Sequence, residues 1–274
     1  MHPLRDWPLE KRRNIVGVFT DIDDTLTTSG AITPDALQAL SDLKQAGLQV
    51  IPITGRPVGW SERFAATWPV DAIVPENGAV ALLRVNRKEF PALYADSSLS
   101  KIYQQDANLR AHNYTRMQAV AARVVREVPQ ARVSRDSAGR ETDIAIDHSE
   151  FSHLDEASIR QVLGIMQQEG MRATVSSIHI NGWYGDHNKL AGARWIVREL
   201  LGRDLSLEMD RWAYVGDSTN DQLMFEAFAN SFGVANIRRF VPHLTFLPRY
   251  ITASERGAGF AEVARALLAH RTPT

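Results

Sequence analysis

The sequence predicts an α/β fold, a doubly wound parallel sheet of the Rossmann type with a smaller α+β domain inserted into it. Short apolar runs alternate with helical patterns near both ends of the chain, which is the order that a parallel sheet requires. The middle third interrupts this rhythm with more polar strands. With 274 residues, the chain is long enough for about two domains.

The first part of the core is predicted over residues 1–80. Residues 14–19 are expected to form a strand, since the apolar run from Ile15 to Phe19 is typical of a parallel strand buried on both faces. Thr33 and Pro34 predict a helix start, as the N-cap and the first helical position, and Gly47 follows the last apolar position of that helix. Further elements of this part are a strand over 48–53, a helix through 60–64 and a short strand over 71–74.

The inserted domain is predicted over residues 81–184, and the second part of the core over residues 185–274. The middle of the chain contains expected strands over 79–83, 143–147 and 173–177 and helical patterns over 117–128 and 154–166. The second core part contains an expected helix over Lys189–Leu201, a strand over 212–215, a helix over 221–228, short strands over 232–234 and 250–252, and a final helix over 260–270. One sheet is therefore expected from two separate pieces of chain.

The composition excludes several classes of protein. The 31 basic and 32 acidic residues nearly cancel, so no charge excess favours nucleic acid or a membrane surface as a partner. The chain has no cysteine, which excludes disulfides, thiolate nucleophiles and cysteine-bound metal sites. No apolar run approaches the roughly 20 residues of a membrane span, and the N-terminus lacks the apolar part of a signal peptide. We expect a cytoplasmic protein, whose oligomeric state the sequence leaves open.

Three carboxylates, Asp21, Asp23 and Asp24, directly follow the first predicted strand. In an extended segment, Asp21 and Asp23 point to the same side. Carboxylates that repel one another at a strand end are stabilised by a cation, and hard oxygen ligands suit Mg²⁺. Taken alone, the segment is explained equally well as a solvated acidic loop in which Asp24 caps a helix.

Thr54, Gly55 and Arg56 directly follow the second predicted strand. A hydroxyl, an unobstructed amide and a guanidinium form a small anion-binding site, and phosphate is the ligand that suits it best. By itself, such a segment is more often a simple turn between a strand and a helix.

Two later segments carry groups of the same kind. Lys189 lies at the predicted start of a helix, where an ammonium and a helix N-terminus both favour an anion. Asp217 and Asp221, in the segment GDSTND, follow a third strand. Taken singly, Lys189 is explained as a solvated side chain and Asp221 as a helix cap.

Considered together, the four segments favour a functional site over four separate structural explanations. Ligands of open α/β sheets bind at the carboxyl ends of the strands, so these segments bring carboxylates, a hydroxyl, a glycine amide and a lysine to one edge. In-line phosphoryl transfer through an aspartate needs the same set: a nucleophile, an acid–base group, metal ligands and neutralising cations.

The segments DIDDT, TGR, the lysine of NKLAG and GDSTND, in this order, resemble the motifs of haloacid dehalogenase (HAD) superfamily phosphatases. The resemblance covers essentially the whole chain. The insertion, entered through VPENGA, is similar to the α/β cap of type IIB members, which include Cof-like, sucrose-phosphate and mannosyl-3-phosphoglycerate phosphatases. One position departs from the pattern, since many relatives carry glycine where this chain has Asp24.

The resemblance implies a role for each carboxylate. Asp21 attacks phosphorus and becomes an aspartyl phosphate, while Asp23 protonates the leaving oxygen and then activates water. Mg²⁺ is held by the Asp21 carboxylate, the Asp23 backbone carbonyl and Asp217. Asp221 orients Lys189 or a metal-bound water.

The resemblance also implies which groups bind the substrate. Thr54 and the Gly55 amide bind the transferring phosphoryl oxygens. Lys189 neutralises charge on these oxygens and on the nucleophile. Asn220 contacts phosphate or substrate. Arg56 adjoins the phosphate loop, and this position favours a contact with substrate over a merely solvated arginine at a helix start.

Within the inserted domain, His179 and Asn181 lie on the last predicted strand, which in relatives often faces the substrate. For Trp183 and Tyr184, packing where the chain re-enters the core is a better explanation than stacking on a sugar.

We therefore expect a Mg²⁺-dependent hydrolase of phosphomonoesters whose partner is a small phosphorylated molecule, a sugar phosphate or a phosphorylated sugar-acid. Asp23 favours phosphate esters over carbon–halogen cleavage, because dehalogenases of this fold lack an acid–base group there. A phosphomutase or phosphotransferase using the same aspartates stays an alternative. Two others are a receiver-like signalling module, against which Asp23 and the chain length argue, and a binding protein without catalysis, against which the four complete motifs argue.

Overall fold

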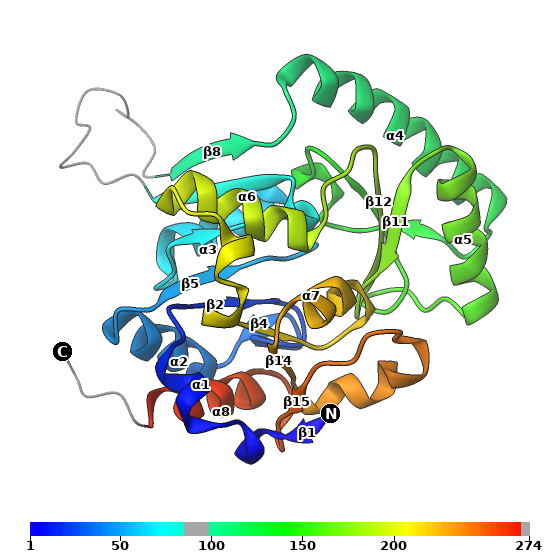
Figure 1. Cartoon of the computed structure of the whole chain (residues 1–274). Helices are drawn as coiled ribbons and strands as arrows, with labels where there is room; N and C mark the ends of the chain where they lie inside the picture. The colour runs from blue at the N-terminus through cyan, green and yellow to red at the C-terminus, as the bar shows by residue number, and fades with distance from the viewer. Residues whose placement is uncertain (85–98, 270–274) are drawn as a thin grey trace.

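The computed structural model describes residues 1–84 and 99–269 of the chain (Figure 1). Its centre is a six-stranded sheet with the order β1-β15-β14-β13-β2-β5, in which every neighbouring pair is parallel. These strands are β1 (His2–Pro3), β2 (Gly17–Thr20), β5 (Gln49–Pro52), β13 (Trp212–Gly216), β14 (Asn230–Gly233) and β15 (Tyr250–Ile251). The predicted parallel sheet, built from both ends of the chain, is confirmed.

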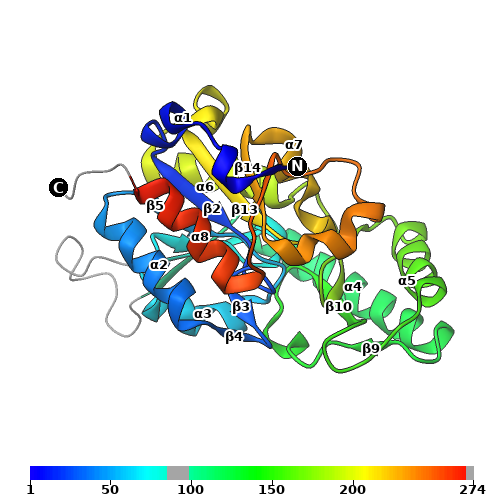
Figure 2. The same ribbon diagram turned by 90° about the horizontal axis from the view of Figure 1, so that it is seen from below.

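Helices cover both faces of this sheet. On one face lie α2 (Pro34–Gln45), α3 (Val58–Thr67) and α8 (Arg256–Leu268), and on the other α6 (Lys189–Leu201) and α7 (Gln222–Ala227). Figures 1 and 2 show α2 and α8 side by side. Successive residues of a strand point to opposite faces, so Val18 packs in one apolar cluster and Phe19 in the other. The sheet is doubly wound, as predicted.

Smaller sheets flank the central one. The hairpin β3 (Thr27–Thr28) and β4 (Ala31–Ile32) follows the first core strand. Antiparallel strands β6 (Ala72–Ile73), β7 (Val80–Arg84) and β8 (Leu99–Tyr103) continue beyond β5, linked by a parallel bridge between Ile53 and Val74. The predicted boundary between residues 80 and 81 falls inside β7, whose residues pack in the core clusters. The division of the chain into domains otherwise stays a prediction.

The inserted domain has its own sheet and its own apolar cluster. Helices α4 (Ala107–Glu127) and α5 (Glu156–Gln168) pack on the antiparallel strands β9 (Arg132–Val133), β10 (Ile144–Asp147), β11 (Arg172–Val175) and β12 (His179–Trp183). All buried members of this cluster lie between Met117 and Tyr184. In Figure 1 the sheet lies between the core and these two helices, so one of its faces is directed toward the core.

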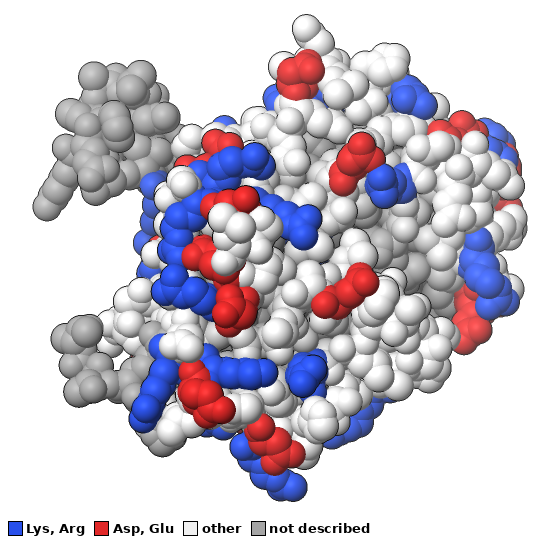
Figure 3. Space-filling view, viewed as in Figure 1, with Lys and Arg blue, Asp and Glu red and all other residues white. Residues whose placement is uncertain are grey.

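Short helical segments complete the described chain. They are α1 (Leu9–Arg13) and the 3₁₀ segments η1 (Leu4–Asp6), η2 (Glu76–Gly78), η3 (Ser137–Gly139), η4 (Leu205–Leu207), η5 (Met209–Arg211), η6 (Thr219–Asp221) and η7 (Ala235–His243). Within the described ranges, no helix has the length and apolar character needed to cross a membrane. On the face drawn in Figure 3, basic and acidic side chains are interspersed, and neither sign forms a large area.

Two helix starts differ from their predictions in detail. Thr33 is the N-cap residue of α2, but its side chain makes no capping hydrogen bond. Helix α8 begins at Arg256, earlier than predicted, and the expected end at residue 270 lies outside the described residues. Glycine disfavours helix in a sequence-based prediction, yet here it permits close packing of two helices. A Cβ at Gly257 would lie 2.0 Å from Thr33 Oγ1 and 3.1 Å from the Ala36 side chain.

Candidate active site

Asp21 and Asp23 lie at the carboxyl end of β2, in the middle of the sheet. The Asp21 amide extends the ladder by donating to the Val215 carbonyl at 2.8 Å. Both residues are buried, with relative exposures of 4% and 8%. The hairpin β3–β4 follows them, and no helix begins at Asp24. The explanation of this segment as a solvated loop with a helix cap is therefore wrong.

Lys189 is the first residue of α6, after the N-cap Asn188, whose side chain accepts a hydrogen bond from the Ala191 amide at 2.9 Å. Its side chain is buried rather than solvated. The ammonium nitrogen lies 2.6 Å from Asp21 Oδ1 and 2.6 Å from Asp221 Oδ1. Burial opposes a charged lysine, but the two carboxylates outweigh it and raise the pKa of Lys189 above its usual value. The site therefore contains a fixed positive charge next to the nucleophile predicted from the sequence.

Asp221 is hydrogen-bonded through both of its oxygens. Oδ1 accepts from the Tyr214 hydroxyl as well as from Lys189. Oδ2 accepts from the backbone amides of Asp217 at 2.9 Å and Ser218 at 3.1 Å, which closes a capping box at the start of η6. With its oxygens engaged in this way, Asp221 contacts the Lys189 ammonium and fixes the turn that carries Asp217. Its predicted role, to orient Lys189 or a metal-bound water, stays a prediction.

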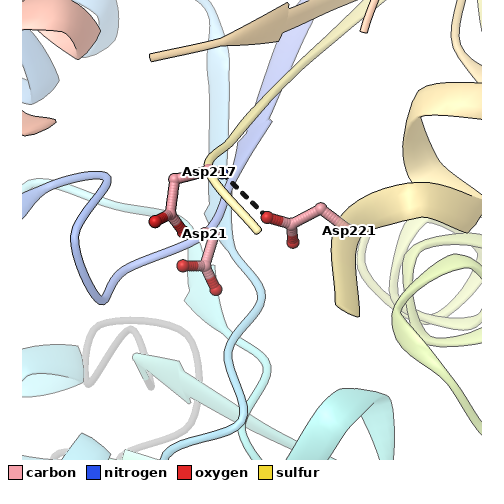
Figure 4. A group of neighbouring side chains, drawn as sticks. All are labelled: Asp21, Asp217 and Asp221. Atoms are coloured by element: carbon pink, nitrogen blue, oxygen red, sulfur yellow. Dashed lines mark hydrogen bonds between the residues drawn. The ribbon is translucent and has the colours of Figure 1, made fainter. Parts of the chain in front are cut away.

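Asp21, Asp217 and Asp221 form a buried group whose ligand atoms lie within 4.8 Å of one another (Figure 4). Burial raises the pKa of Asp21 to about 7, with Lys189 opposing the effect and the neighbouring carboxylates adding to it. Burial, together with the nearby carboxylates of Asp21 and Asp221, raises the pKa of Asp217 well above its usual value. Asp217 Oδ2 accepts from the Asn236 side chain at 2.9 Å, whereas Oδ1 is buried without a hydrogen-bond partner among the described residues.

These residues fit a divalent cation. Three buried carboxylates face one ammonium and the partly exposed Arg239 guanidinium, 3.5 Å from Asp217 Oδ2, so carboxylates outnumber the cations and a further cation would offset them. Carboxylate oxygens are the hard ligands that Mg²⁺ prefers. The free oxygen of Asp217 and the carboxylate of Asp21 are the side-chain ligands available, since Asp221 is already engaged. The predicted contribution of the Asp23 backbone carbonyl stays a prediction.

Thr54 and Gly55 form a tight loop after β5. Thr54 is fully buried, and its Oγ1 accepts from the Arg56 amide at 3.1 Å. A Cβ at Gly55 would lie 3.3 Å from Asn181 Oδ1 and 3.4 Å from Asn77 Nδ2. The loop therefore lies directly beneath two amide side chains, one of them from the inserted domain. Its predicted binding of phosphoryl oxygens stays a prediction.

Arg56 lies beside Asp23. Its Nε donates to both Asp23 oxygens at 3.0 and 2.9 Å, and its other nitrogens reach Asp136 at 3.2 Å and Glu150 at 2.7 Å. Three carboxylates, two of them from the inserted domain, thus surround one buried guanidinium. The predicted contact of Arg56 with substrate stays a prediction, and the contact found is with the predicted acid–base group.

Asn220 is half-buried in η6, where its Oδ1 accepts from the Ser218 hydroxyl at 2.9 Å. Together with Asn77, Trp183 and Lys189 it lines a cavity of about 360 Å³ between the core and the inserted domain. Both polar atoms of the Asn77 side chain are buried without a hydrogen-bond partner among the described residues. The contact of Asn220 with phosphate stays a prediction, but the residue does border a space next to the lysine.

The position that departs from the motif pattern has an unusual backbone. Asp24 has a φ of 54°, in the left-handed region where glycine is the least strained residue. Its carboxylate accepts from Arg256 at 3.0 Å and from Arg239 at 2.9 Å, and its carbonyl accepts from Asn236 at 3.0 Å. These contacts hold Asp24 in a left-handed conformation that glycine would adopt with less strain. This agrees with the glycine that the motif pattern often has at this position.

Comparisons with known proteins agree with this geometry. Residues 18–120, which contain Asp21, Asp23 and the loop of Thr54 and Gly55, match a family model described as haloacid dehalogenase-like hydrolase. A protein of Streptococcus pyogenes serotype M6, named as a candidate phosphatase, is 22% identical over 267 residues, 90% of this chain and 96% of that protein. The chain is therefore similar to haloacid dehalogenase-like hydrolases over residues 18–120.

Solved structures share the fold of this hydrolase over nearly its whole length. A Thermoplasma acidophilum protein matches with a TM-score of 0.68 at 16% identity, covering 92% of this chain and 98% of that chain. The sucrose-phosphatase of Synechocystis sp., solved with sucrose and phosphate, gives 0.61 at 15% identity, with 93% and 97% covered. The C-terminal domain of C. albicans trehalose-6-phosphate phosphatase gives 0.65 at 12% identity, with 98% of both chains covered. The predicted fold class is confirmed.

Sequence reasoning missed several residues that border the site of this hydrolase. Tyr214 was expected only as part of a strand, although its position two residues before Gly216 places it near the turn. Arg140 donates to the Gly55 carbonyl at 3.0 Å, and Asn181 donates to the same atom at 3.3 Å. Asn181 was a candidate from its strand, whereas no local signal marks Arg140, because its contact depends on how the inserted domain packs on the core.

Proposed function

We propose that this hydrolase is a Mg²⁺-dependent phosphatase that forms an aspartyl phosphate at Asp21. The observation that carries the proposal is the buried pairing of Asp21 with Lys189, which Asp221 holds from the other side. A carboxylate fixed against an ammonium at a strand end suits nucleophilic attack on an anionic phosphorus centre. The match of residues 18–120 to the hydrolase family model and the phosphatases among the similar proteins support the same activity.

Each residue then has a defined part. An Asp21 oxygen attacks phosphorus, the bond to the leaving oxygen breaks, and Asp23 gives its proton to that oxygen. Asp23 afterwards takes a proton from water, which attacks phosphorus and releases inorganic phosphate from Asp21. Lys189, Thr54 and the Gly55 amide bind the phosphoryl oxygens. Asp21, Asp217 and the Asp23 carbonyl would hold Mg²⁺, which when bound supplies positive charge to the phosphate and the nucleophile.

The substrate we propose is a sugar phosphate or a phosphorylated sugar-acid. The sucrose-phosphatase and the trehalose-6-phosphate phosphatase named above act on phosphorylated sugars by their names, and each shares the fold. The amide side chains of Asn77 and Asn220 beside Lys189 offer donors and acceptors for a hydroxyl-rich group. A phosphomutase would use the same aspartates, with a second substrate hydroxyl in place of water. A cytoplasmic location stays a prediction.

The test is phosphate release from a panel of phosphomonoesters, with Mg²⁺ and with EDTA. The panel contains glucose, mannose, sucrose and trehalose 6-phosphates, 3-phosphoglycerate, p-nitrophenyl phosphate and, as an outgroup, AMP. We expect release that needs Mg²⁺ and is lost in Asp21→Asn. The matched control is Asp210→Asn, the same change at an exposed position, which should release phosphate at the wild-type rate. Release that continues in EDTA or in Asp21→Asn would contradict the proposal.

A further inference from the structure

Arg56 links the core to the inserted domain through three carboxylates. It follows the phosphate loop, and its guanidinium binds both oxygens of Asp23 through Nε. The adjacent edge of the same guanidinium contacts Glu150, with Nη2 to Oε1 at 2.7 Å and Nη1 to Oε2 at 3.3 Å, and Nη2 also lies 2.9 Å from Asp23 Oδ1. The Trp60 ring covers it, with the guanidinium carbon 5.1 Å from the ring centroid. Asp23 and Glu150 therefore share one buried partner.

Glu150 is itself fixed in place. The loop after β10 is folded around the carboxylate of Asp147, which accepts hydrogen bonds from four successive backbone amides, including that of Glu150 at 2.9 Å. The Nε2 atom of His179 lies 3.0 Å from Glu150 Oε2. Although burial opposes ionisation, His179 and Arg56 lower the pKa of Glu150 to about 2. Glu150 is therefore a rigidly held carboxylate at the edge of the inserted domain.

We propose that Glu150 is a positioning residue for Asp23, acting through Arg56, so that the inserted domain sets the orientation of the acid–base group. The inference rests on the proposed function, because it assigns Asp23 the proton transfer described there. Glu150 and Asp23 bind adjacent edges of one planar guanidinium, which has a fixed fork of donors, and both contact Nη2. When Glu150 fixes the plane of the guanidinium, it also fixes where the Asp23 carboxylate can bind.

This role has a consequence that a purely structural role lacks. When the bond from phosphorus to the leaving oxygen breaks, an alcohol needs the proton of Asp23, whereas p-nitrophenolate leaves without one. A misplaced Asp23 therefore slows the transfer from a sugar phosphate far more than the transfer from p-nitrophenyl phosphate. A general loss of structure would slow both reactions equally.

The first experiment compares Glu150→Gln with the wild type on both kinds of substrate. For the sugar phosphate that the wild type hydrolyses fastest, we expect kcat/KM to fall about tenfold or more, since this ratio reports the formation of the aspartyl phosphate and general acid catalysis contributes about 10²–10⁴ in rate. For p-nitrophenyl phosphate, kcat/KM should fall less than about threefold; kcat is not compared, because hydrolysis of the aspartyl phosphate needs Asp23 with either substrate. The matched control is Glu156→Gln, which removes an exposed ion pair with Arg160 in the same domain and should change neither ratio. An equal loss of kcat/KM on both substrates, or no loss, would overturn the proposal.

The second experiment does not depend on activity. A double-mutant cycle of Asp23→Asn and Glu150→Gln is read out as the thermal midpoint of unfolding. If the two carboxylates share Arg56, the shift of the double variant should differ from the sum of the single shifts by about 2 °C or more. Additive shifts would mean that Glu150 and Asp23 are not coupled through Arg56, and the proposal would be wrong. If the wild type released no phosphate from any substrate, the proposed function would fail. The cycle would still show whether Asp23 and Glu150 are coupled through Arg56.

Discussion

The ammonium nitrogen of Lys189 lies 2.6 Å from the Oδ1 atom of Asp21, although the two residues are 168 positions apart in the chain. Both side chains are buried, so their attraction is only weakly screened by water. Asp21 comes from the end of β2, and Lys189 from the first turn of α6. The contact therefore joins the two core segments that flank the inserted domain, and it defines the point at which an anionic phosphate would be attacked.

Replacing Lys189 by methionine should impair both activity and stability. Without the ammonium, the charge on the phosphoryl oxygens and on Asp21 is not offset, and we expect phosphate release to fall about 10²-fold or more. Removing one partner of a buried ion pair leaves the other charge uncompensated, at a cost of about 3 kcal/mol in the free energy of unfolding. Assays of phosphate release and urea unfolding measure the two effects. Replacement of the exposed Arg13 by methionine is the control. A Lys189→Met variant with wild-type activity would contradict the account.

Mg²⁺ should stabilise the wild-type protein against heat, and Asp217→Asn should remove this effect. A ligand at about 100 times its dissociation constant stabilises the folded state by about 2.7 kcal/mol. Without Mg²⁺, the buried carboxylates of Asp21, Asp217 and Asp221 disfavour one another, and the variant removes one of them. We expect Asp217→Asn to melt at or above the wild-type temperature in EDTA and to show no shift with Mg²⁺. Calorimetry checks this, and an equal Mg²⁺ shift in both proteins would refute the assignment of Asp217 as a ligand.

The left-handed backbone at Asp24 predicts different outcomes for two small replacements. Asp24→Gly loses partly exposed ion pairs worth about 0–1 kcal/mol but removes the strain of a φ of 54°. Asp24→Ala loses the same contacts and keeps the strain, which costs about 1–2 kcal/mol. We therefore expect the alanine variant to be about 1–2 kcal/mol less stable than the glycine variant in urea unfolding. Equal stability of the two variants would show that the left-handed conformation carries no strain.

His187 should make the protein less stable as the pH falls below neutrality. Burial, aided by Arg172, lowers the pKa of His187 to about 4, while the unfolded chain has the ordinary value of 6.5. Between these values the unfolded state binds a proton that the folded state does not, so stability is lost as the pH falls from about 6.5 to about 4.

The change can be measured by urea unfolding at pH 7.5 and pH 5. Over this interval the wild type should lose about 2 kcal/mol more than His187→Phe, which keeps a ring against Trp183 but cannot titrate. Groups that titrate in both proteins cancel in the comparison. Parallel pH profiles for the two proteins would mean that His187 is not held neutral by burial.

The core and the positions of its acidic groups could be predicted because the signals are local. Strand β2 is apolar on both faces and ends directly before Asp21, and Lys189 was predicted as the first residue of the helix that it does begin. The parallel order of the strands then brings their carboxyl ends to one edge. Asp221 was predicted to orient Lys189 or a metal-bound water, and its carboxylate lies 2.6 Å from the Lys189 ammonium.

The partners of Arg56 could not be predicted in the same way. Asp136 and Glu150 lie 80 and 94 residues away in the chain, in loops of the inserted domain that have no motif of their own. Their meeting with Arg56 depends on how one domain packs on the other, which no local pattern encodes. The early start of α8 was missed for a related reason: glycine disfavours a helix locally, and the close packing of Gly257 against Thr33, which leaves no room for a Cβ, appears only in the folded chain.

The central claim is that Asp21 becomes phosphorylated, and mass spectrometry of a trapped intermediate tests it most directly. Asp23→Asn should still accept the phosphoryl group from p-nitrophenyl phosphate, because that leaving group needs no proton, but it should fail to activate water for the second step. After acid quenching, the account predicts one phosphoryl group on the peptide that contains Asp21, and none in the double variant with Asp21→Asn. A phosphoryl group on another residue, or none on a variant that still releases p-nitrophenolate, would contradict it.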